Sequence, residues 1–211
     1  MRRGLAVAGA VALAAALAGA GFASGSAHDR VVRAADAMEH LRGVRFSLEA
    51  SSLATGAAPL GGDLALHYRG TGELAPPDRL RLRVTEPRPA TLVILGESVR
   101  IDGAPASVAS LRTLASPIAL LEQLREEGRA TFAGVGFTRG GLTARYRIDR
   151  GDRGVVEVEL GLFDDRVRRQ TFTIGQSADD DGSGLETVRT SYVIEYWDFD
   201  VPLDPGEPAA P

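Results

Sequence analysis

The chain of 211 residues lacks cysteine and lysine, and it has only three histidines. Without cysteine the protein can form no disulfide bond, no thiolate metal site and no thiol nucleophile, and no lipid can be attached to a cysteine behind an export signal. The three histidines are scattered and fall on expected surface positions, so we expect no metal site and no cofactor.

Motifs for catalysis are also lacking. A serine nucleophile elbow needs glycines two residues before and two residues after the serine, and Ser98 and Ser177 each lack the second glycine. Gly134-Val135-Gly136 lies inside an expected strand without the helix of a dinucleotide-binding loop, so we interpret it as a bend or bulge. Glu157 and Glu159 share one strand face, as solvent-facing acids commonly do. We therefore expect a protein that is not an enzyme.

Residues 1–27 resemble a secretory signal. Arg2 and Arg3 precede an uncharged stretch over residues 5–20, and Gly25-Ser26-Ala27 fits a small-x-small cleavage site. We expect an exported protein, periplasmic or extracellular; an uncleaved segment that holds it at the membrane is the alternative. Loss of Arg2 and Arg3 changes the formal charge from −4 to −6, which disfavours a nucleic-acid partner.

Two segments have apolar residues at helical spacing. The first is His28–Arg42, with Asp29 as its expected N-cap and Gly43 behind it. The second is Ser116–Gly128, where a proline follows the N-cap serine. Both segments should lie against the apolar side of a sheet.

In the remainder, up to about residue 201, apolar and polar residues alternate. This pattern is typical of antiparallel strands that have one buried face and one solvent-exposed face. Eight to ten strands are expected, followed by a proline-rich tail over residues 202–211. A two-residue turn at Asp164-Asp165 would pair Glu157 with Phe172, so we expect a bulge or a longer loop there. We predict an α+β fold, in which two or three helices cover the concave face of a strongly curved, half-open sheet.

Several segments also carry a resemblance to a known family. They are the export signal, the helix that leads into Val44-Arg45-Phe46-Ser47-Leu48, the segment from Gly72 to Leu80, the Ser116-Pro117 helix, Tyr146-Arg147-Ile148, and the ending Asp198-Phe199-Asp200-Val201-Pro202. In this order of elements residues 28–201 resemble the LolA-like superfamily, and more narrowly the LppX/LprG-type envelope lipoproteins. The resemblance implies a half-open barrel that binds lipids or acyl chains and carries them across the cell envelope. The lipidated cysteine of those lipoproteins is missing from this chain.

The apolar strand faces and the second helix would then line a cavity for a lipid, a glycolipid or another apolar ligand. We expect the following lining residues: Phe46, Leu48, Leu66, Tyr68, Leu82, Val84, Ile118, Leu121, Val158, Leu160, Phe172 and Ile174. The alternative is that these side chains pack together as a filled core, in a structural or interaction module of the envelope that holds no ligand.

Arginines cluster at two places, Arg79-Arg81-Arg83 and Arg166-Arg168-Arg169. Arginine stays charged and its guanidinium group can bind two oxygens of one anion. One interpretation of these clusters is contact with anionic lipid headgroups, and hence with a membrane surface. The other interpretation is that they form ordinary ion pairs across strands.

Overall fold

The computed structural model describes residues 27–55, 64–96, 98–105, 130–151, 154–177 and 187–203. Within these residues, no helix is long and apolar enough to cross a membrane. The predicted signal and the predicted helix over residues 116–128 lie outside them, so α2 (Ala27–Glu39) is the single helix that can be described.

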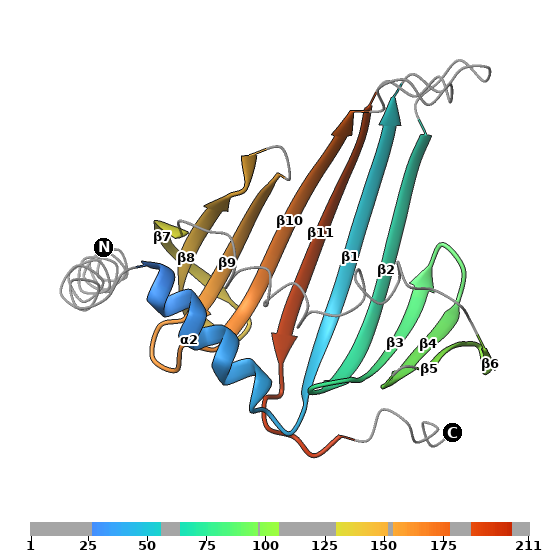
Figure 1. The fold of residues 1–211 in the computed structure, drawn as a ribbon, viewed down its shortest axis with the longest axis horizontal. Helices are drawn as coiled ribbons and strands as arrows, with labels where there is room; N and C mark the ends of the chain where they lie inside the picture. Colours follow the sequence, from blue (N-terminus) through green and yellow to red (C-terminus); the bar gives the residue numbers. More distant parts are fainter. Residues whose placement is uncertain are drawn as a thin grey trace, which may run out of the picture.

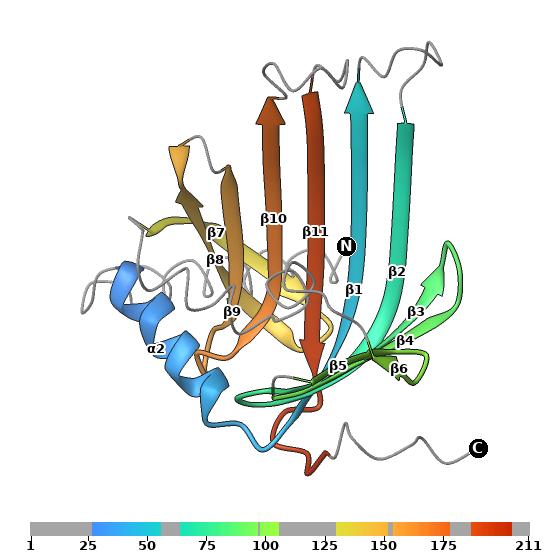
Figure 2. The same ribbon diagram turned by 45° about the vertical axis from the view of Figure 1, so that its right-hand side comes forward.

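The described strands form one antiparallel sheet in the order β6-β5-β4-β3-β2-β1-β11-β10-β9-β8-β7. Its outer strands curl out of the plane of four long central ones, so the sheet is curved and open, as the alternating pattern predicts (Figures 1 and 2). The strands are β1 (Val44–Thr55), β2 (Leu64–Ala75), β3 (Arg79–Glu86), β4 (Ala90–Leu95), β5 (Ser98–Ile101), β6 (Ala104–Pro105), β7 (Ala130–Thr138), β8 (Gly141–Asp149), β9 (Val155–Gly161), β10 (Val167–Ser177) and β11 (Thr187–Trp197). The two-residue β6 takes the number of strands past the eight to ten expected.

Helix α2 covers one end of the sheet on its inner, concave face (Figure 2). The expected helical spacing is confirmed, because Val31, Ala34, Ala35 and Met38 are its buried residues. The helix begins at Ala27, so Asp29 lies in its first turn, where a carboxylate favours the helix dipole, rather than at the N-cap.

Charged side chains form hydrogen bonds between α2 and the turn that joins β9 to β10. Arg30 Nε donates to Asp165 Oδ1 at 2.6 Å, and its NH2 group donates to the carbonyl oxygen of Leu162 at 3.1 Å. Asp165 has a positive φ of 48°, a backbone conformation that aspartate tolerates better than most residues. The position of α2 therefore depends on one turn of the sheet as well as on apolar packing.

Two predicted irregularities are confirmed. The register of β9 and β10 shifts between Val167 and Arg169, so that Phe172 stands opposite Val156 and not opposite Glu157. The register of β7 and β8 shifts beside Gly134, whose φ of +131° suits glycine. Each shift keeps the apolar side chains on the inner face of the sheet.

Candidate functional site

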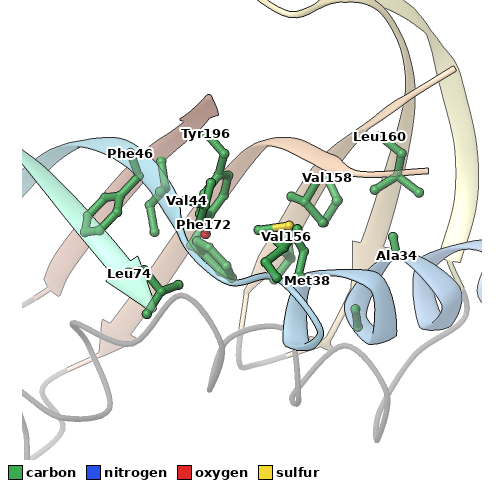
Figure 3. Packing of buried hydrophobic residues seen from close by; sticks show 14 of the residues in the cluster. Ala34, Met38, Val44, Phe46, Leu74, Val156, Val158, Leu160, Phe172 and Tyr196 are labelled. Carbon is green, nitrogen blue, oxygen red and sulfur yellow. The ribbon is translucent and has the colours of Figure 1, made fainter. Parts of the chain in front are cut away.

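The inner face contains a packed core where α2 lies over it. Figure 3 shows Ala34 and Met38 of α2 beside Val156, Val158 and Leu160 of β9. The apolar cluster continues across the sheet to Phe46 and Tyr196, which are 2% and 3% exposed. This part of the inner face is filled by the protein's own side chains.

Gly72 makes room for this packing. It stands opposite Phe46 on the neighbouring strand, and a Cβ atom at Gly72 would lie 2.4 Å from the Phe46 ring. The ring of Phe46 therefore lies where any other residue at position 72 would place its side chain. Gly72 is required here because of close approach, with an ordinary backbone conformation.

A second row of side chains crosses the inner face further along the long strands, beyond Phe46. Tyr68, Ala50, Tyr192 and Phe172 are consecutive cross-strand partners on β2, β1, β11 and β10, and we call them the tyrosine row. Phe172 is buried, Tyr192 is half-buried, and Tyr68 is 42% exposed. The four long strands extend beyond α2 (Figure 1). The apolar inner face thus continues past the helix and becomes open towards β2.

The next row adds polar groups. Ser52 Oγ and Thr190 Oγ1 lie 3.1 Å apart across β1 and β11 and share a hydrogen bond. The backbone register places Leu66 on one side of this pair and Ile174 on the other. Along the strands, the inner face therefore changes from a packed apolar core to tyrosines and then to hydroxyl groups.

The register places all ten predicted lining residues of the strands on the inner face. Their surroundings differ: Phe46, Leu82, Val158, Leu160 and Phe172 are buried in the core, Leu48 and Val84 are half-buried beside it, and Tyr68 is exposed. The backbone of Leu66 and Ile174 lies in the hydroxyl row. Ile118 and Leu121 lie outside the described residues. Whether any of these residues lines a ligand site stays a prediction.

Sequence reasoning missed a polar pair within the core. Tyr196 donates its hydroxyl hydrogen to Gln170 Oε1 at 3.0 Å, and both residues are buried. Burial raises the pKa of Tyr196 well above 10.0. The sequence contained a signal for the inward position of Gln170, because Gln170 lies two residues before Phe172 and therefore on the same strand face.

Tyr192 was also missed, although it alternates with Ile194 and Tyr196 on β11. Burial raises its pKa, and the nearby Tyr68 raises it further. Its hydroxyl group is therefore neutral at physiological pH and able to donate a hydrogen bond to a ligand.

Charged side chains of the outer face form ion pairs with one another. Arg166, Arg168 and Arg169 pair with Asp200, Asp164 and Glu195, respectively, so this predicted cluster consists of ion pairs. Glu159 is buried, accepts a hydrogen bond from Thr143 at 2.7 Å and lies 3.5 Å from Arg145. These contacts hold Glu159 in place and are structural in character. Across the described ranges, no group of three or more acids and histidines could hold a metal ion.

No family model and no curated protein match this chain. Solved structures that align with this chain include LprF from Mycobacterium bovis, at 11% identity and a TM-score of 0.46, with 87% of this chain and 97% of that one covered. A LolA superfamily protein from Nitrosomonas europaea aligns at 10% identity and a TM-score of 0.34, covering 83% and 93%. MucB in the MucA/MucB complex of Pseudomonas aeruginosa aligns at 14% and 0.37, covering 82% and 56%.

These similarities concern the path of the backbone only. No family model supports the LolA-like or the narrower LppX/LprG-type assignment, so both stay resemblances of the sequence. At such identities and TM-scores, no ligand or partner carries over from these proteins.

Proposed function

We propose that the protein binds an amphiphile with an acyl chain, such as a lipid or glycolipid, on the inner face beyond α2, and that it does so outside the cytoplasm without catalysing a reaction. The observation that carries this proposal is the change in polarity along the long strands. An acyl chain would lie against Leu48, Tyr68 and Tyr192, while its polar end would meet the hydroxyl groups of Ser52 and Thr190.

The exposure of apolar groups supports this orientation. Tyr68 is 42% exposed although it shares the inner face with the core residues. Each methylene group that moves from water to such a surface contributes about 0.8 kcal/mol. A chain of moderate length therefore gains enough free energy for binding even after the cost of its own ordering.

A second stretch of apolar surface lies on the β7–β8 hairpin. Phe132, Val135, Phe137 and Leu142 are between 39% and 79% exposed, and their register positions share the inner face. Exposed apolar surface of this kind also marks protein interfaces. It favours the second candidate function, an interaction module whose packed core is structural and whose hairpin contacts a protein partner.

A binding titration with matched variants tests the proposal. A dansyl-labelled fatty acid should bind the wild-type protein saturably and be displaced by unlabelled palmitate. Tyr68→Arg places a charge in the tyrosine row and should weaken binding by roughly tenfold or more, because the acyl chain would then have to desolvate it.

His67→Arg is the matched control. His67 is exposed on the same strand, and its side chain lies on the opposite face of the sheet. This variant should keep wild-type affinity. Equal weakening by both substitutions, or no saturable binding of the fatty acid, would reject the amphiphile site and leave the interaction module as the better reading.

A further inference from the structure

A second candidate site lies on the outer face, where β1, β2 and β3 run side by side. A groove of about 340 Å³ is lined by Arg45, Thr71, Gly72, Glu73, Arg81, Arg83 and Trp197. In the register, Trp197, Arg45, Glu73 and Arg81 are consecutive partners on β11, β1, β2 and β3. The next row places Arg83 opposite Thr71. This groove is on the opposite side of the sheet from the proposed amphiphile site and is independent of it.

The groove has more positive than negative charge. Two of its three arginines share the carboxylate of Glu73, which lies 3.5 Å from Arg45 Nε and 4.0 Å from Arg81 Nη1. Asp198, at the rim, lies 3.1 Å from Arg45 NH1. Arg83 is exposed and has no ion-pair partner among the described residues, so its guanidinium group is available to a ligand. Even with Asp198 counted, the groove carries an excess of one positive charge.

The donors suit a tetrahedral oxyanion better than a single point charge. Arg81 is only 14% exposed and is held within the groove wall, while Arg83 lies two residues along the same strand. The hydroxyl group of Thr71 stands opposite Arg83. Guanidinium groups bind phosphate oxygens in pairs, and a phosphate ester carries one to two negative charges at neutral pH.

Trp197 adds an aromatic wall. Its ring is contacted by the guanidinium group of Arg139, which lies 5.6 Å from the ring centroid. An aromatic face beside arginines favours a phosphate that is attached to an organic group over free inorganic phosphate. We propose that this groove binds the phosphate group of an anionic organic ligand, with Arg83 as the main free contact.

Intrinsic fluorescence reports on this site directly, because Trp197 is the single tryptophan of the chain. Phenyl phosphate, a phosphate ester with an aromatic group, is the soluble probe. Vesicles of phosphatidylglycerol, with phosphatidylcholine vesicles as the reference, test the same phosphate chemistry on a membrane surface. We expect a saturable change in Trp197 fluorescence with phenyl phosphate, with phosphatidylglycerol vesicles, or with both, that weakens as the salt concentration rises. The two arms identify whether the phosphate belongs to a soluble ligand or to a lipid headgroup.

Arg83→Gln should weaken the response to the active probe by roughly tenfold or more. Arg69→Gln is the matched control, because Arg69 is also exposed on the outer face but is already held by Glu49 at 2.9 Å and Glu86 at 3.8 Å. It removes the same net charge and should leave binding unchanged within about twofold. Failure of both probes, or an equal loss in both variants, would overturn the proposal.

Discussion

The packed core beneath α2 and the tyrosine row lie on the same face of the same strands, yet their side chains are buried to different extents. Phe46 is 2% exposed, whereas Tyr68, on the neighbouring strand, is 42% exposed. Both positions belong to the same apolar alternation. The difference lies in what each ring packs against: Phe46 lies over Gly72, with its ring centroid 6.4 Å from that of Tyr196 and inside the buried cluster, whereas Tyr68 lies outside that cluster.

This contrast separates structural from functional apolar residues. A core residue is judged by the free energy of unfolding that it contributes, while a residue of a binding face should contribute little to unfolding and much to ligand affinity. The following substitutions test that separation, from the largest expected effect on stability to the smallest.

Phe46→Ala should lower the free energy of unfolding by about 3–5 kcal/mol, because it leaves a cavity among buried side chains. Tyr68→Ala should lower it by less than about 1 kcal/mol, since its ring is already in contact with water. Urea unfolding of both variants measures the difference. Similar losses would mean that the tyrosine row is part of the core.

Gly72→Ala should cost about 1–3 kcal/mol, because the added Cβ atom would lie 2.4 Å from the Phe46 ring and 2.5 Å from the carbonyl oxygen of Arg81. In a Phe46→Leu background part of this cost should be relieved, since the colliding ring atoms are gone while the close approach to the Arg81 carbonyl oxygen remains. A double-mutant cycle measures this coupling. If the two substitutions are additive, the close approach does not determine the packing.

Arg30→Gln should destabilise the protein by about 1–2 kcal/mol, because it removes a charged hydrogen bond to Asp165 in a partly buried setting. Arg33→Gln is the control: its contact with Asp165 is 3.8 Å and its side chain is 56% exposed. Its cost should stay below about 0.5 kcal/mol. Equal thermal or urea stability of the two variants would contradict the role of Arg30 in fixing α2.

Alkaline pH should reveal the buried Tyr196. The native state holds the phenol proton more tightly than the unfolded chain does, because burial raises the pKa well above 10.0. This contribution to stability is complete below pH 10 and is lost progressively as the pH rises above it. Urea unfolding of Tyr196→Phe should show a smaller alkaline loss than the wild type; an unchanged loss would place the effect elsewhere.

Much of this fold follows from local pattern. Strict alternation predicted the strands, and the clash between Glu157 and Phe172 predicted the shift in register that the structure contains. The charged partners of Arg166, Arg168 and Arg169 could not be predicted, because Asp200 and Glu195 come close only once β10 and β11 pair.

The candidate site was predicted less well than the fold. Alternation identified residues of the inner face, but it could not tell Phe46 from Tyr68, because the burial of Phe46 depends on partners from other strands, Gly72 on β2 and Tyr196 on β11. The outer groove is likewise non-local: Arg45, Glu73, Arg81 and Trp197 come from four strands. Sequence showed an arginine cluster at Arg79-Arg81-Arg83, and only the register showed which of its members faces an acid.

Photo-crosslinking with a diazirine-bearing palmitic acid tests the central claim most directly. The account predicts saturable labelling that excess palmitate prevents, in peptides from β2 and β11 that contain Tyr68 and Tyr192. The labelling should be lost in Tyr68→Arg and retained in His67→Arg. Labelling that palmitate does not compete, or that maps to outer-face side chains such as His67, would contradict an amphiphile site on the inner face.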